Sequence, residues 1–141
     1  MRSEQDGGMV FAKLEDGEDF FGSLREVAAK HGIGSGVIIS GIGMLKGSVI
    51  GYFPGHGAYE ESSFPEPMEL TSMQGNIATK DGDAVFHVHV SMAGPDKRVH
   101  GGHLIKGTVN IVNEIAILRT GGIRLSRQES AKTGLLELRI G

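Results

Sequence analysis

Apolar and polar side chains alternate strictly in the middle of the chain. Over residues 83–92 one face of an extended segment would be apolar, and the other face would carry His87 and His89. This alternation predicts a half-buried β-strand, and it places the two imidazoles on the same side, about 7 Å apart at the usual strand rise. The apolar positions are Ala84, Phe86, Val88, Val90 and Met92.

Other segments rich in Val and Ile are also bounded by Gly and turn residues, which predicts further short strands. Helical spacing of apolar residues occurs once, over 19–30, with acidic residues before it and Gly32 placed for a left-handed cap. The stretch 54–67, punctuated by Pro and Gly, is expected to be an irregular connection. Together these patterns predict an α+β fold, a strongly twisted antiparallel β-sheet with one main helix packed on it. The predicted strands are 8–14, 35–43, 47–53, 68–78, 83–92, 98–105, 107–119, 123–126 and 134–140.

Composition narrows the class of protein. At 141 residues the chain is expected to form a single domain, 1–141, and no apolar run is long enough for a membrane span. The absence of cysteine excludes disulfides and thiolate chemistry, and the N-terminus has no secretory signal, so we expect a cytoplasmic protein. The 23 glycines indicate tight turns and close strand packing. Gly41 and Gly43 do not form a dinucleotide-binding loop, because Lys46 stands where its third glycine belongs.

Three histidines form the candidate site. The segment 99–104 returns after a turn and brings His103 toward His87 and His89. Three neutral imidazoles can hold Zn²⁺ and leave a fourth position open, although nickel, copper and iron accept the same ligands. His100 is a second-choice ligand, since it lies on the opposite face unless a bulge at Gly101 and Gly102 reverses the order. The competing interpretation is a polar face, either solvated or buried at a subunit interface.

A metal with an open position would allow two functions. The first is binding of a small anionic ligand by a regulatory or interaction module. The second is a zinc-dependent enzyme that uses a metal-bound water on a small-molecule substrate, with Glu69 or Glu114 as the candidate general base. A third interpretation is DNA contact, which the net charge of −3 opposes. The basic residues that could contact DNA are Lys97, Arg98, Lys106, Arg119, Arg124 and Arg127.

Four motifs in a fixed order give the chain a family resemblance. They are 40–43 (SGIG), 69–77 (ELTSMQGNI), 87–94 (HVHVSMAG) and 99–104 (VHGGHL), and they span most of the sequence. The chain resembles the plants-and-prokaryotes-conserved (PPC) domain. The resemblance implies a compact domain built on an antiparallel sheet, assembly as a homotrimer, and the description of prokaryotic members as DNA-binding. The AT-hook that enters the minor groove in plant proteins, an Arg-Gly-Arg core flanked by prolines, does not occur here.

Overall fold

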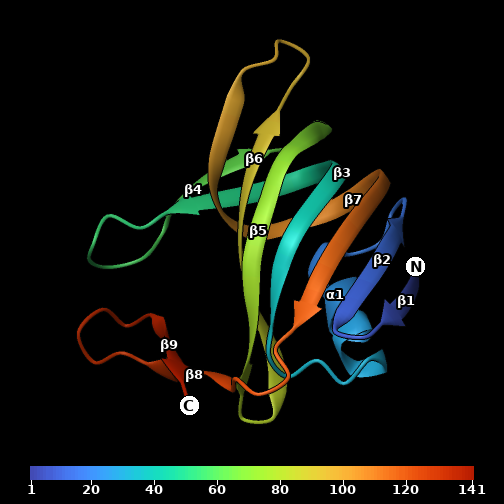
Figure 1. Ribbon diagram of the computed structural model, residues 1–141. Coiled ribbons are helices and arrows are strands. Elements are labelled where there is room, and N and C mark those ends of the chain that lie inside the picture. The colour runs from blue at the N-terminus through green and yellow to red at the C-terminus, as the bar shows by residue number, and fades with distance from the viewer.

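A computed structural model describes residues 1–141 and contains one helix and a nine-stranded sheet (Figure 1). The predicted secondary structure, mostly β-strands with one helix, is confirmed. No helix has the length and apolar character needed to cross a membrane. The elements are β1 (Arg2–Asp6), β2 (Met9–Glu15), α1 (Phe20–Lys30), β3 (Gly36–Tyr52), β4 (Glu60–Phe64), β5 (Met68–Lys80), β6 (Asp83–Ala93), β7 (Val99–Arg119), β8 (Leu125–Glu129) and β9 (Leu136–Ile140).

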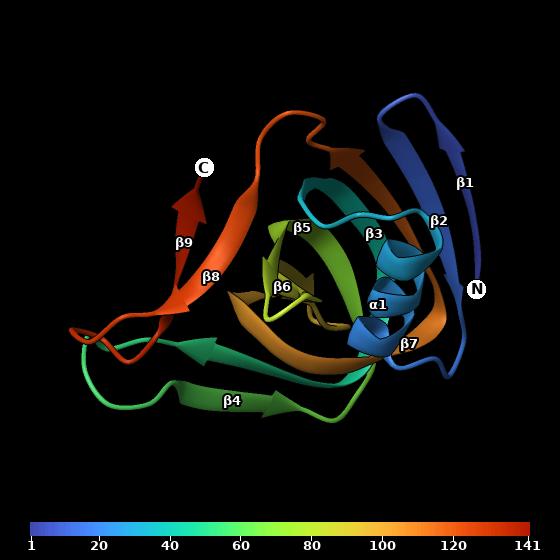
Figure 2. The same ribbon diagram turned by 90° about the horizontal axis from the view of Figure 1, so that it is seen from below.

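Four strands of the sheet pair in a closed cycle. β3 pairs with β5, β5 with β6, β6 with β7, and β7 returns to β3, in every case antiparallel. Outside this cycle, β2 extends the sheet from β7 and β1 pairs with β2 at the edge. The hairpin of β8 and β9 joins β5 through one parallel pair, Thr79 with Ser126, and stands to one side of the cycle (Figure 2). The α+β fold with an antiparallel, twisted sheet is therefore observed.

The predicted strand boundaries were wrong in two ways. The pairs 35–43 with 47–53 and 98–105 with 107–119 are each one continuous strand, β3 and β7. Register shifts along the β3–β7 ladder let these long strands bend where glycines suggested a break. In addition, β1 and β4 were not predicted, and β4 lies in the stretch expected to be irregular. Both are short, mostly exposed edge strands, which need no apolar alternation.

The turn chemistry of the sequence is observed at both ends of α1 and in one hairpin. Asp19 caps the helix by accepting a hydrogen bond from the Gly22 amide at 2.6 Å. At the other end Gly32 has a φ of 60°, and the Ile33 amide donates to Ala28 at 2.8 Å, which closes a left-handed cap. Between β5 and β6, Asp81 and Gly82 both have positive φ, as a two-residue hairpin turn requires.

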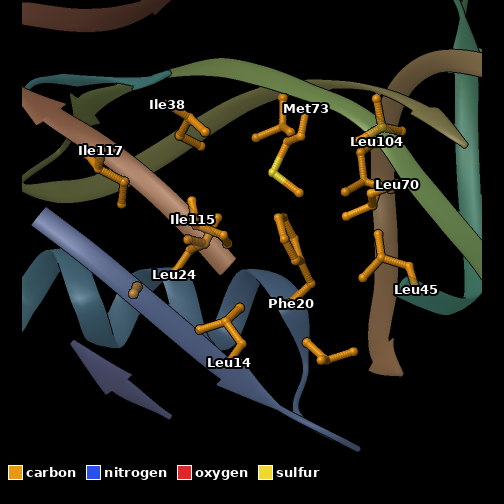
Figure 3. Packing of buried hydrophobic residues seen from close by; sticks show 14 of the residues in the cluster. Leu14, Phe20, Leu24, Ile38, Leu45, Leu70, Met73, Leu104, Ile115 and Ile117 are labelled. Carbon is orange, nitrogen blue, oxygen red and sulfur yellow. The ribbon is translucent and has the colours of Figure 1, made fainter. Parts of the chain in front are cut away.

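The helix covers the inner face of the sheet. Phe20 and Leu24 project from α1 into the core, where Phe20 lies beneath Met73 of β5 and Leu24 lies beside Ile115 of β7 (Figure 3). All four side chains are almost completely buried. The outer face of the same sheet has no such cover and exposes a set of apolar side chains: Met9, Phe11, Val37, Ile39, Ile42 and Leu118.

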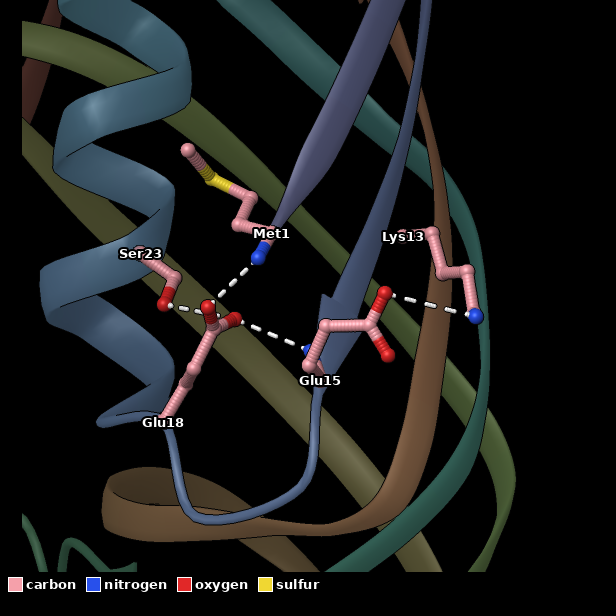
Figure 4. A network of polar contacts seen from close by, with 5 residues as sticks. All are labelled: Met1, Lys13, Glu15, Glu18 and Ser23. Atoms are coloured by element: carbon pink, nitrogen blue, oxygen red, sulfur yellow. Dashed lines mark hydrogen bonds and ion pairs between the residues drawn. The ribbon is translucent and has the colours of Figure 1, made fainter.

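Glu18 ties the start of α1 to the edge strands (Figure 4). Its carboxylate accepts from the Met1 amine at 2.6 Å, the Glu15 amide at 2.9 Å and the Ser23 hydroxyl at 3.4 Å. Lys13 pairs with Glu15 at 3.3 Å on the exposed side of β2. This network links Glu18, just before α1, to the N-terminus and to the end of β2.

Candidate metal centre

The structure brings the three predicted histidines together. His89 of β6 is directly opposite His103 of β7, and His87 follows two residues away on the same face. One ring nitrogen from each histidine can be chosen so that all three lie within 4.8 Å of one another. The Nε2 atoms of His87 and His89 are 3.1 Å apart, close to the separation of about 3.3 Å between neighbouring nitrogen ligands of tetrahedral zinc. The donors therefore converge with a spacing suited to one ion.

His100 does not join this cluster. The register between β6 and β7 runs without a shift from His89 opposite His103 to Ala93 opposite Val99, so Gly101 and Gly102 form no bulge. His100 is paired with Met92 on the opposite face, and its ring packs against Phe64 with centroids 5.0 Å apart. Alternation along an uninterrupted strand thus selects His103 over His100.

Burial favours the neutral forms of His87 and His103. Desolvation, followed by the charges of His103 and Arg127, lowers the pKa of His87 to about 4. Burial likewise lowers the pKa of His103, with His89 and Arg127 adding to the effect. Neutral imidazole is the form that binds metals. The Nδ1 atom of His103 is buried and has no hydrogen-bond partner, so one potential donor atom of the cluster is unsatisfied. The lowered pKa values and the unsatisfied ring nitrogen both fit a metal-binding site.

Arg127 of β8 reaches across the sheet to the cluster. Its Nη2 lies 3.3 Å from Nδ1 of His87 and also bonds the Asn76 side-chain oxygen, while Nη1 donates to the Leu136 carbonyl at 2.9 Å. Because a guanidinium only donates, this contact requires an unprotonated Nδ1 on His87, which places the ring proton on Nε2 in the metal-free protein. A metal bound at Nε2 would replace that proton and the contact with His89, and the ring proton would then lie on Nδ1, without a hydrogen bond from Arg127.

Tyr59 covers the other side of the cluster. Its ring stacks on His103 with centroids 4.9 Å apart and planes 20° apart, and Phe53 packs behind it at 5.6 Å. Gly51, opposite His103 in the ladder, makes room for this ring, since a Cβ there would lie 2.8 Å from Tyr59. On the other flank, a Cβ at Gly75 would lie 2.3 Å from the His87 carbonyl. Two glycines therefore allow the close packing around the histidines.

A pocket of about 330 Å³ opens beside His87 and His103. Glu69 and Glu114, the two candidate bases, are exposed on other parts of the sheet and do not line it. From the sequence, Arg127 was interpreted only as a DNA contact and Tyr59 as part of an irregular stretch. Neither residue is near the histidines along the chain, so no local pattern connects them with the site. The lining residues are Tyr59, Val85, Phe86, His87, His103, Arg127, Gly134, Leu135 and Leu136.

The basic residues proposed for DNA contact belong to different parts of the fold. Lys97 and Arg98 lie at the turn between β6 and β7, where Arg98 pairs with Asp96 at 3.6 Å. Lys106 lies within β7, Arg119 ends the same strand, and Arg124 precedes β8. Arg127 is partly buried and contacts His87. No single element therefore presents these charges together.

Solved structures with this fold come from archaea and bacteria. The plant- and prokaryote-conserved protein of Pyrococcus horikoshii is 32% identical, with a TM-score of 0.84 over 93% of this chain and 92% of that one. A metal-containing protein from Archaeoglobus fulgidus is 30% identical, with a TM-score of 0.86 over 99% of both chains. A candidate DNA-binding protein from Bacteroides thetaiotaomicron has a TM-score of 0.90 over 98% of this chain and 96% of that one, and at 24% identity it shows the fold alone.

Sequence comparison points to the same family. A curated relative, the bifunctional protein GlmU of a Synechococcus strain, is 28% identical over 129 residues, which cover 91% of this chain. The chain spans only about a fifth of that protein, 20% of its length. The family model of the Plants and Prokaryotes Conserved domain, abbreviated PCC or PPC, matches residues 1–120. The chain therefore belongs to the Plants and Prokaryotes Conserved domain family.

Proposed function

We propose that this protein is a metal-binding module in which His87, His89 and His103 hold one zinc ion with a fourth position open. The observation that carries the proposal is the convergence of three ring nitrogens within 4.8 Å. The low pKa of His87 supports it because neutral imidazole binds metals, and the unsatisfied Nδ1 of His103 supports it because this ring nitrogen has no partner in the protein. The similarity to an archaeal protein described as metal-containing agrees with it.

Binding is favoured over catalysis as the role of this site. A zinc ion with three histidine ligands offers its remaining position to a small anion or a water molecule. The surrounding residues shield the site: Tyr59 stacks on His103, and Arg127 lies beside His87. No Asp or Glu lines the pocket, so the chain supplies no carboxylate base for an enzyme mechanism there.

Elemental analysis tests the metal site. Protein purified without chelator and reconstituted with zinc is expected to carry about one ion per chain. The His87→Ala/His89→Ala variant should carry none, because one histidine alone cannot hold the ion. His56→Ala is the matched control, since His56 is exposed in the loop between β3 and β4. Metal-free wild type, or equal zinc in the double variant, would contradict the proposal.

We also propose that the chain assembles with itself as a homotrimer. The exposed apolar side chains of the outer face support self-association, because such a surface is typical of interfaces, and the number of three subunits rests on the family resemblance. His87 belongs to the same face: the ladder runs from His87 through Asn76, Val37 and Leu118 to Met9. Light scattering should give the mass of a trimer for wild type and a smaller mass for Phe11→Glu. A monomeric wild type would contradict this assembly.

DNA binding rests on the descriptions of relatives alone. The net charge of −3 and the scattered basic residues argue against strong phosphate contact. We expect no mobility shift of duplex DNA at low salt. A salt-dependent shift that disappears in Lys97→Ala/Arg98→Ala would establish DNA as a partner.

A further inference from the structure

Arg127 carries a charge that nothing in the protein neutralises. Its side chain is partly buried, and its partners are His87, Asn76 and the Leu136 carbonyl, none of which is an anion. The ion pairs of the structure involve other residues. A partly desolvated guanidinium gains more from an anion than an exposed one does, and it recognises carboxylates through paired hydrogen bonds. This feature indicates an anion-binding position.

The pocket beside Arg127 and the histidines has an apolar part. Val85 and Phe86 of β6, together with Leu135 and Leu136 where the β8–β9 turn enters β9, supply this apolar lining. The volume of about 330 Å³ lies at the small end of ligand pockets. Charge at one end and apolar walls beyond it match an amphiphilic molecule of modest size.

We propose that this pocket binds a small monocarboxylic acid with an aliphatic or aromatic body. Arg127 receives the carboxylate next to His87, and the body packs between β6 and the hairpin of β8 and β9. The inference rests on the proposed function in one respect, that the carboxylate lies beside the metal trio, and it specifies the class of ligand that the site takes. The contact with Arg127 itself requires no metal.

The hairpin selects the ligand in this arrangement. Arg127, Leu135 and Leu136 all follow residue 120, where the match to the family model ends. The hairpin stands off from the strand cycle (Figure 2), and residues of both line the pocket. The histidines therefore come from the part of the chain that defines the family, and the carboxylate contact comes from outside it.

Calorimetric titration with hexanoate and hexanamide tests the proposal on the intact protein. The two probes differ in charge and hardly in shape, so wild type is expected to bind hexanoate about tenfold or more tightly than hexanamide. Arg127→Gln should lose this preference and Arg127→Lys should retain part of it. Arg124→Gln is the matched control, because Arg124 is exposed and does not line the pocket.

Zinc content, measured on the same samples, separates this proposal from the metal site. Arg127→Gln is expected to keep its zinc while hexanoate affinity falls, and chelator-treated wild type should still prefer hexanoate to hexanamide. Equal binding of acid and amide by wild type overturns the proposal whether or not zinc is present, and it needs no variant to fold. Unchanged hexanoate affinity in a folded Arg127→Gln protein overturns it as well.

Discussion

The two faces of β6 differ in burial and in the kind of side chain that they carry. On the inner face Val88 and Met92 are 0% exposed and pack in the core beneath the sheet. His87 and His89, the two neighbours of Val88 along the chain, lie on the outer face, where His87 is partly buried and His89 is exposed. Strict alternation lets a single strand stabilise the fold on one side and present chemistry on the other. The two roles should therefore respond separately to mutation.

The largest effect is expected on the inner face. Met92→Ala removes a fully buried side chain from a packed core, which should lower the free energy of unfolding by about 2–5 kcal/mol. Urea denaturation with chelator present measures this loss. Zinc per folded chain should stay unchanged, and a variant that loses zinc while folded would show that the two faces are coupled.

Metal binding should stabilise the protein through the outer face alone. Zinc at a hundred times its dissociation constant should raise the free energy of unfolding of wild type by about 2.7 kcal/mol, since only the folded state holds the trio. His87→Ala/His89→Ala should show no increase. Denaturation curves with and without zinc give both values, and an equal gain in the double variant would place the metal elsewhere.

The pH dependence should sharpen the contrast in the metal-free protein. The pKa of His87 is about 4 in the folded state, below its ordinary value of 6.5. The unfolded chain therefore binds more protons between these values, and stability should fall as pH drops from about 6.5 toward 4. His87→Gln should flatten this part of the curve, whereas His56→Gln should leave it intact. A wild-type profile that is flat over this range would contradict the burial of a neutral His87.

The smallest effect is expected at the turn that follows β6. Arg98 is exposed and pairs with Asp96 at 3.6 Å, in a part of the hairpin where neither face is buried. Arg98→Gln should change the free energy of unfolding by less than about 0.5 kcal/mol, because exposed ion pairs contribute little. A larger loss in urea denaturation would mean that this turn packs against something, such as another subunit.

Local patterns were sufficient to predict much of the fold. Alternation located β6, and the acidic residues and Gly32 located the ends of α1, because these signals depend only on neighbouring residues. The long strands β3 and β7 were divided in the prediction, since a glycine that permits a bulge resembles a glycine that ends a strand. The charged strand β1 carries no apolar period and was missed for that reason.

For the candidate site, the sequence predicted which histidines lie together but not the residues that surround them. His87, His89 and His103 belong to one hairpin, so strand geometry alone brings them together. Arg127 and Tyr59 come from elements that meet the hairpin only in three dimensions. Their contribution depends on how β8 docks and how the stretch before β4 folds back, and neither follows from local sequence.

The placement of the three histidines on one hairpin also has a consequence for the order of folding. Pairing β6 with β7 closes a short loop, whereas pairing β2 with β7 joins Val10 to Ile117 from nearly opposite ends of the family domain. Short loops cost less entropy to close and form earlier. The donor set is therefore assembled by one of the quickest steps of sheet formation, while the cover provided by Arg127 arrives from one of the last segments of the chain.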